Sequence, residues 1–277
     1  MTHIKTVCLT LGPYRNLTTL TASVLFLHPN CQVLNHAGDR IFNNSDVNFL
    51  SAYSKERFNN FIRYATKISG GGKRGDYGGS VTLAHAFDSH YILGELFKKT
   101  GQHLIKKQID CLFWKESLKT SNFIKEYRVD LGYIFNNEER LRFLMPIRNP
   151  MDCAKSNLRT GHANRFISIT KSTTANEVLL AVLNEIHWFA KNKELFPDRF
   201  FYYFEHSISR DMLKELADFL KLDKNEEWLN NAEIALVSKS KYEHDKDFIE
   251  FYKENVKEIF HEMPDFKDRL LQFVSNR

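Results

Sequence analysis

The chain has 277 residues, of which 43% are hydrophobic and 26% are charged, and its formal net charge is +5. This length allows one large α/β domain or two small ones, and the hydrophobic share is ample for a core. The mild positive charge suits an anionic ligand, but it is too weak and too dispersed to indicate a nucleic-acid-binding protein.

The sequence also gives expectations about metal sites, membranes and compartment. The four cysteines are scattered and form no Cys-x-x-Cys pair, so we expect neither a zinc site nor a disulfide framework. No stretch approaches the ~20 apolar residues that span a bilayer. The apolar run near the start is too short for a signal peptide. We therefore expect a protein of the reducing cytoplasm.

Apolar runs and helical periodicities alternate along the chain, which predicts strands that alternate with helices. This alternation predicts a single α/β domain over 1–277, with a mostly parallel central sheet, helices on both of its faces and a helical C-terminal extension at 223–277. In chain order, the expected elements are a strand at 4–12, a helix at 18–27, a strand at 32–38, a helix at 54–68, a loop with six glycines at 69–80, a helix at 81–99, a strand at 102–108, a short apolar run at 111–117, a helix at 123–137, a strand at 140–150, helices at 151–161 and 176–197, a strand at 198–206, a helix at 209–222 and helical chain from 228 onward.

The turn Gly12–Thr19 follows the first expected strand. Ligands of such sheets bind beyond the carboxyl ends of the strands. If the helix begins near Leu17 or Thr18, its free N–H groups point at the turn. Arg15 adds a fixed positive charge, and the two threonines add hydroxyl donors. This combination predicts a site for a tetrahedral oxyanion.

A second turn, Arg148–Ser156, follows the expected strand at 140–150. Pro150 suits the first position of a helix because it has no N–H to leave unpaired. Ser156 lies about two helical turns further on and can return beside Arg148. A guanidinium fork and a hydroxyl together suit a phosphate group.

In this order, the two turns resemble the two signatures of the sulfotransferases that use 3′-phosphoadenosine 5′-phosphosulfate (PAPS). The first signature reads roughly Gly-x-x-Lys/Arg-Ser-Gly-Thr-Thr, and the corresponding residues here are Gly12, Arg15, Asn16, Leu17, Thr18 and Thr19. The second reads roughly Arg-Asn/Asp-Pro-x-Asp-x-x-x-Ser, and its five fixed positions are matched by Arg148, Asn149, Pro150, Asp152 and Ser156. The resemblance extends from about residue 4 to residue 222.

The resemblance implies a P-loop-like sulfotransferase fold, PAPS as the sulfuryl donor, PAP as the product and no metal. It implies that the six residues of the first signature bind the 5′-phosphosulfate, and that Arg148 and Ser156 bind the 3′-phosphate. Arg15 would stabilise negative charge on the bridging oxygen rather than act as an acid. The acceptor would be a hydroxyl or amine of a carbohydrate, a glycolipid or a small metabolite, and the sequence does not identify it.

The acceptor's proton needs a base, and there are three candidates, His36, Glu116 and Asp39, of which the first two are ranked equal. His36 follows the second expected strand. Glu116 lies in a segment similar to the family's Lys-Asp/Glu-Pro or Lys-Thr-His element. Asp39 is close to His36 in sequence, and Lys115 is expected to face the acceptor or the cofactor. The alternative interpretation of each candidate base is a polar residue that only caps a strand end.

The chain departs from the first signature at Asn16 and Leu17, where Ser and Gly are usual. Leu17 either adopts ordinary helical angles or deforms the loop, since Gly permits backbone conformations that Leu avoids. This departure favours one alternative function, a catalytically inactive protein that binds a nucleotide or a partner.

The other alternative, a P-loop small-molecule kinase, would need a Lys-Ser/Thr pair for metal-bound nucleotide, and the first turn lacks it. The segment Gly70–Gly75 resembles a phosphate loop but lacks that pair as well. It predicts a lid or surface loop, in which Lys73 and Arg74 can help to hold an anionic acceptor or the cofactor.

Overall fold

Six strands form one sheet in the order β3-β2-β4-β1-β5-β6, in a computed structural model that describes residues 4–75, 77–88, 90–101, 103–169, 173–236 and 242–275. Neighbouring strands pair in parallel, except that β3 is antiparallel to β2. The predicted α/β fold with a mostly parallel sheet is therefore confirmed. The strands are β1 (Thr6–Thr10), β2 (Cys31–Asn35), β3 (Gly79–Ser80), β4 (Cys111–Lys115), β5 (Leu141–Ile147) and β6 (Phe200–Phe204).

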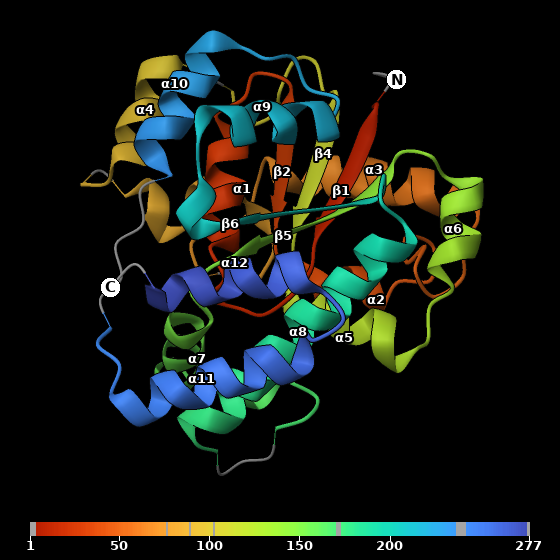
Figure 1. Ribbon diagram of the computed structural model, residues 1–277. Helices are drawn as coiled ribbons and strands as arrows, with labels where there is room; N and C mark the ends of the chain where they lie inside the picture. The colour runs from red at the N-terminus through yellow and green to blue at the C-terminus, as the bar shows by residue number, and fades with distance from the viewer. Residues whose placement is uncertain are drawn as a thin grey trace.

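Helices cover both faces of the sheet, as Figure 1 shows. The strands β1 and β4 are buried along their whole length because each contributes side chains to both faces. The helices are α1 (Thr18–Phe26), α2 (Gly38–Phe42), α3 (Lys55–Ser69), α4 (Ile92–Thr100), α5 (Leu118–Glu126), α6 (Leu131–Asn137), α7 (Pro150–Arg159), α8 (Ala175–Leu195), α9 (Arg210–Phe219), α10 (Glu226–Ala235), α11 (Lys246–Ile259) and α12 (Pro264–Ser275).

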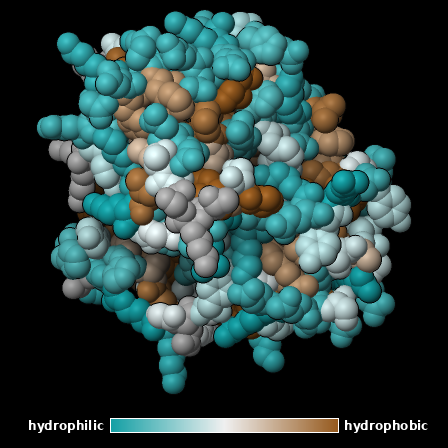
Figure 2. Space-filling view, turned by 90° about the horizontal axis from the view of Figure 1, so that it is seen from below, coloured by the Kyte–Doolittle hydropathy of each residue, from teal (hydrophilic) through white to brown (hydrophobic). Residues whose placement is uncertain are grey.

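The two faces carry separate hydrophobic cores. One core joins the sheet to α3, α5, α7, α8 and the C-terminal helices α11 and α12. The other joins it to α1, α4, α9 and α10. Seen from below, the surface is mostly hydrophilic and its hydrophobic residues form small separate patches (Figure 2). No helix of the described chain has the length and apolar character needed to cross a membrane.

Three expected elements differ from the structure. The strand expected at 102–108 is wrong: within its described part, 103–108, there is no strand. The Gln32 side chain holds this part of the chain, because its Nε2 donates to the carbonyl of Leu104 and its Oε1 accepts from the N–H of Lys106. The helix expected at 81–99 begins only at Ile92, after two short 3₁₀ turns. The helix expected at 123–137 is two helices, α5 and α6, separated at Arg128, whose φ is 49°.

The strand order explains why the two predicted anion-binding turns meet. The strands β1 and β5 are far apart in sequence, yet they are parallel neighbours, with Thr10 opposite Leu144. Since parallel strands end at the same edge of a sheet, the turns that follow β1 and β5 lie beside each other. The remaining site residues follow β2 and β4 at this same edge.

Candidate active site

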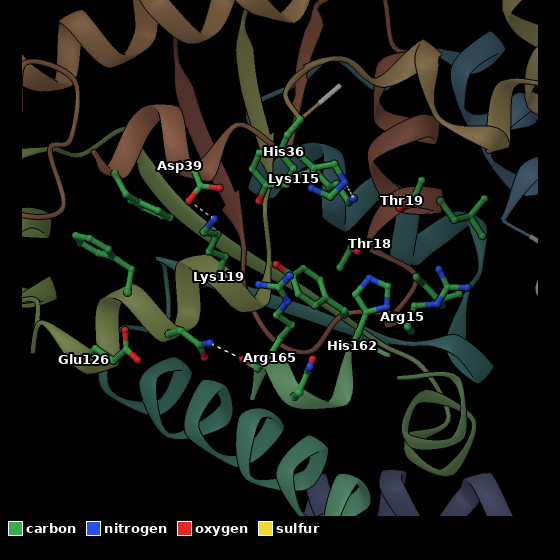
Figure 3. A pocket seen from close by; sticks show the side chains of 18 of the residues that line it. Arg15, Thr18, Thr19, His36, Asp39, Lys115, Lys119, Glu126, His162 and Arg165 are labelled. Carbon is green, nitrogen blue, oxygen red and sulfur yellow. Dashed lines mark hydrogen bonds and ion pairs between the residues drawn. The ribbon is translucent and has the colours of Figure 1, made fainter. Parts of the chain in front are cut away.

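A cavity of about 1080 Å³ is lined by residues that follow four adjacent parallel strands. Arg15 follows β1, His36 follows β2, Lys115 ends β4 and Arg148 follows β5, and all four side chains line the cavity. Figure 3 shows Arg15, His36 and Lys115 around it, with Thr18 and His162 nearby. The structure thus brings residues from both halves of the chain into one site.

Gly12 begins the first turn in a conformation that favours glycine. Its φ is +91°, and an added Cβ would lie 2.4 Å from Cε of Met145. Its N–H donates to Oγ of Ser121 at 2.8 Å. Gly12 therefore does not line the cavity itself, but it lets the turn pass between β5 and α5.

Leu17 has left-handed backbone angles, with φ 60° and ψ 4°. Of the two expectations for this residue, ordinary helical angles are therefore wrong, and the loop adopts the type of conformation that a glycine would permit. Leu17 is the N-cap of α1 and supplies no side-chain cap, so the first N–H groups of this helix are left for an anion. Thr18 and Thr19, in the first turn of α1, line the cavity with Leu17.

Asn16 is buried and ties the first turn to the second rather than lining the cavity. Its Oδ1 accepts from the backbone N–H of Arg148 at 2.8 Å, and its Nδ2 donates to the carbonyl of Pro146. Next to it, Nε of Arg15 donates to Oγ of Ser156 at 3.1 Å. The two signatures that the sequence places far apart are therefore joined by direct hydrogen bonds.

The second turn holds Arg148 in a nearly enclosed position, with 13% of its side chain exposed. Asn149 is the N-cap of α7 and accepts from the N–H of Met151 at 3.0 Å. Asp152 lies 3.6 Å from Nη2 of Arg148, and its other oxygen accepts from Nε2 of the buried His244 at 2.8 Å. Asp152 therefore braces the guanidinium from behind, with help from the C-terminal segment.

These observations fit an anion with several negative charges. The Nε of Arg148 is buried and has no hydrogen-bond partner within the described chain. The N-terminus of α1 has no side-chain cap, and Arg15 lies between the two turns. A buried guanidinium nitrogen without a partner loses free energy that a phosphate oxygen would restore.

His36 and Glu116, the two candidate bases ranked equal, occupy different positions. His36 lines the cavity, and its Nε2 lies 3.0 Å from Nζ of Lys115. Glu116 is 0% exposed and does not line the cavity; its Oε2 accepts from the N–H of Gly38 at 2.8 Å and its Oε1 from the hydroxyl of Tyr77. The Nδ1 of His36 lies 3.8 Å from Oε1 of Glu116. Glu116 therefore lies behind His36 and Tyr77, which line the cavity, and does not line it itself.

Two basic groups that line the cavity, Lys115 and His162, have pKa values below the ordinary ones. Burial, with a further contribution from Arg15, lowers the pKa of Lys115 to about 8, although Glu116 opposes the shift. Burial and the nearby Arg15 also lower the pKa of His162, which lines the cavity. A bound anion would raise both pKa values and so favour the charged forms of these two groups.

Backbone strain is concentrated at this site. Of the seven non-glycine residues with positive φ in the described chain, five lie where β1, β2 and β4 end. Such conformations cost about 1–3 kcal/mol each and persist where the surrounding structure enforces them, which happens most often at functional sites. The five residues are Arg15, Leu17, His36, Ala37 and Ser117.

The sequence interpretation missed several residues that line the cavity. His162 and Arg165 lie in the loop after α7, Lys119 lies on α5 and Tyr77 lies in the glycine-rich loop. Only Tyr77 had a signal, because the glycine-rich loop was expected to cover a site.

The glycine-rich loop was expected to contribute Lys73 and Arg74, and neither of them lines the cavity. Arg74 instead pairs with Asp88 at 2.7 Å. The loop follows α3 rather than a strand, which separates it from a phosphate-binding loop. Within the described chain, no cluster of three or more His, Cys, Asp or Glu residues is arranged to hold a metal ion.

Comparisons with known proteins add information on the fold. Neither a scan against protein-family models nor a search of curated proteins finds a match. Among solved structures, the chain is similar to a sulfotransferase from Alicyclobacillus acidocaldarius, with 10% identity and a TM-score of 0.45 over 94% of this chain and 96% of that one. It is also similar to a mouse sulfotransferase complexed with PAP, with 11% identity and a TM-score of 0.47 over 99% and 89% of the two chains. A sulfotransferase from Mycobacterium avium has 13% identity and a TM-score of 0.46, over 95% of this chain and 76% of that one. We base the function below on this chain's own residues.

Proposed function

We propose that this protein is a PAPS-dependent sulfotransferase that acts on a hydroxyl or amine of a carbohydrate, a glycolipid or a small metabolite. The observation that carries the proposal is the direct contact between the two anion-binding turns, through Arg15 and Ser156 at 3.1 Å and through Asn16 and Arg148 at 2.8 Å. Two phosphate-binding elements in one cavity suit a ligand with separate 5′ and 3′ anionic groups.

The first turn would hold the 5′ end of the donor. The free N–H groups at the start of α1 and the hydroxyls of Thr18 and Thr19 bind oxyanion oxygens. Gly12 and Leu17 supply the backbone shape of the loop, and Asn16 fixes it to the second turn.

The second turn would hold the 3′-phosphate. Arg148 offers its unpaired Nε, and Ser156 offers its hydroxyl. We regard the C-terminal extension as part of the same domain, because His244 braces Asp152 behind Arg148.

PAPS supplies the sulfuryl group, and the protein supplies position, charge and a proton acceptor. Arg15 stabilises the negative charge that develops on the bridging oxygen as its bond to sulfur breaks and the acceptor oxygen or nitrogen bonds to sulfur. The acceptor's proton passes to Nε2 of His36. For this, Lys115 must turn from His36 toward the anionic donor, and its position between His36 and the Arg15 side of the cavity allows that movement.

Glu116 acts in this scheme as a positioning residue. Its carboxylate is enclosed and accepts hydrogen bonds from Gly38 and Tyr77, so it does not receive the acceptor's proton. Instead it lies 3.8 Å from Nδ1 of His36, where it favours a proton on that nitrogen and leaves Nε2 as the base.

The first experiment is calorimetry with PAP and, separately, with ATP and magnesium. We expect PAP to bind and ATP with magnesium to bind much more weakly. A failure of PAP to bind would overturn the assignment, and a preference for ATP with magnesium would favour a kinase.

The second experiment measures release of PAP from PAPS across a panel of hydroxyl and amine acceptors. We expect His36→Asn to reduce turnover by about 10²–10⁴-fold while PAP affinity stays within error. His261→Asn, a change at an exposed histidine, is the matched control. PAP binding with no transfer to any acceptor would instead support a protein that binds the nucleotide without catalysis.

A further inference from the structure

The end of the cavity away from the two anion-binding turns has an aromatic wall. Phe42 and Phe123 are stacked with ring centroids 4.4 Å apart and planes at 8°, and Phe123 and Tyr127 are stacked at 4.4 Å and 24°. All three line the cavity. Figure 3 shows Glu126, which lies on α5 between the last two of these rings in sequence, on the opposite side of the cavity from Arg15.

Arg165 lines the same cavity as this aromatic wall. In Figure 3 its side chain points into the cavity, near Lys119 and His162. Its backbone is fixed, because its carbonyl accepts from Nδ2 of Asn122 at 2.8 Å. Its guanidinium group makes no hydrogen bond or ion pair within the described chain, whereas the neighbouring Lys119 already pairs with Asp39. Arg165 is therefore a positioned cation without a counter-charge.

We propose that the acceptor is a ring-bearing hydroxyl compound with a negatively charged group, such as a uronic acid glycoside, and that Arg165 determines this specificity by binding the anionic group. This inference rests on the proposed sulfotransferase function. The ring packs against the part of this aromatic wall that lines the cavity; because the three rings are stacked on one another, it meets mainly their edges and the outer faces of Phe42 and Tyr127. The anionic group meets Arg165, which can bind a carboxylate with two parallel hydrogen bonds.

The charges on the cavity walls fix the orientation of such a ligand. Glu126 lies on α5 between Phe123 and Tyr127 in sequence and lines the cavity, so it repels an anion there. Asp39 is neutralised by Lys119 on α5. The side of the acceptor that carries the negative charge is therefore directed inward, to Arg165, while the amides of Asn122 and Asn164 remain for neutral polar groups.

The test compares two probes that differ only at C6, 4-nitrophenyl β-D-glucoside with a neutral hydroxymethyl group and 4-nitrophenyl β-D-glucuronide with a carboxylate. Binding of each probe to the PAP-saturated protein is measured by calorimetry, so that no turnover is needed. We expect the glucuronide to bind about tenfold more tightly, which corresponds to one charge-assisted contact in a partly exposed site. Arg165→Gln should abolish this preference, and Arg165→Lys should keep part of it.

Two controls separate this proposal from the function on which it rests. Glu126→Gln removes a charge from the same cavity and should retain or increase the preference for the glucuronide. PAP affinity should be the same in all variants, and a loss of PAP binding in the unmodified protein would refute the sulfotransferase assignment instead. The acceptor proposal is overturned if the PAP-bound protein binds the two probes equally, if it binds neither, or if Arg165→Gln keeps the preference.

Discussion

In the proposed function, Lys115 should make PAP binding sensitive to pH in a range where ordinary lysines do not titrate. Burial is the main cause that lowers its pKa to about 8; Glu116 opposes this shift and Arg15 contributes to it. A bound anion favours the charged form and raises this pKa, so binding takes up protons. Because the protonated form is lost as pH rises through 8, PAP affinity should fall between pH 7 and pH 9.

The magnitude follows from the titration of a single group. If PAP binds only the protonated form, its apparent dissociation constant is multiplied by about 1.1 at pH 7 and about 11 at pH 9, which is a tenfold loss of affinity, or about 1.4 kcal/mol. An ordinary lysine with a pKa of about 10.4 would change the affinity very little over this range. The phosphate groups of PAP are almost fully ionised above pH 7 because their second pKa is about 6.

The tyrosines at the site do not mimic this effect, and the Lys115→Gln variant separates Lys115 from His162, whose lowered pKa a bound anion also raises. Burial and the charge of Glu116 raise the pKa values of Tyr14 and Tyr77 far above pH 9. The assay is calorimetry at pH 7, 8 and 9 in buffers with different ionisation enthalpies, which reports proton uptake directly. Near pH 8 we expect an uptake of about 0.5 proton per PAP. The matched variant Lys115→Gln should bind PAP more weakly at pH 7 and show no slope. A flat profile for the unmodified protein, or a slope that persists in Lys115→Gln, would refute this account of Lys115.

Three further substitutions test the two turns. Arg148→Ala should weaken PAP binding by about 10- to 100-fold, the value of a charge-assisted hydrogen bond, while circular dichroism shows an intact fold; an unchanged dissociation constant would remove the second turn from the site. Arg15→Ala should reduce turnover by about 10²–10³-fold and PAP affinity by much less, and a normal rate with a true acceptor would contradict its role. Leu17→Gly relieves about 1–2 kcal/mol of left-handed strain and introduces about 0.5–1 kcal/mol of chain entropy, so urea unfolding should show a free energy equal to that of the unmodified protein or up to about 1.5 kcal/mol higher. Leu20→Gly, within α1, is its control and should lower it; equal losses in both would argue against strain at Leu17.

The sequence predicts the sheet well where strands are buried and fails where local pattern and packing disagree. Residues 111–115 and 141–147 are apolar over a strand's length and form the central strands β4 and β5. The segment at 102–108 has only two adjacent apolar residues, Leu104 and Ile105, and they are 45% and 46% exposed. The side chain of Gln32 forms hydrogen bonds with the carbonyl of Leu104 and the N–H of Lys106. A strand would need these backbone groups to pair with a neighbouring strand. No local pattern reveals such a contact.

In the site as well, the residues that follow strands can be predicted from the sequence, whereas the positions of loop residues depend on tertiary contacts. The approach of Arg15 to Arg148 is predictable, because both residues follow strands that end at one edge of a parallel sheet. The positions of His162 and Arg165 depend on how the loop after α7 folds back over the cavity, and no spacing in the sequence encodes that. Tyr77 reaches Glu116 only because Gly78, with φ +105°, turns the chain close to Ala37.

The departure from the first signature involves two residues that act together, Asn16 and Leu17, rather than Leu17 alone. Leu17 in a left-handed conformation costs about 1–2 kcal/mol, which alone would favour a deformed loop. Its neighbour Asn16, however, makes two hydrogen bonds to the end of β5 and the start of the second turn, one through its amide nitrogen and one through its amide oxygen. A serine has a shorter side chain with a single hydroxyl oxygen, which cannot replace these two separate atoms. Each such bond contributes about 0.5–1.5 kcal/mol, which is enough to offset the strain. The loop therefore keeps a shape suited to an anion although the usual glycine is absent. It does so because Asn16 fixes the first turn to the second.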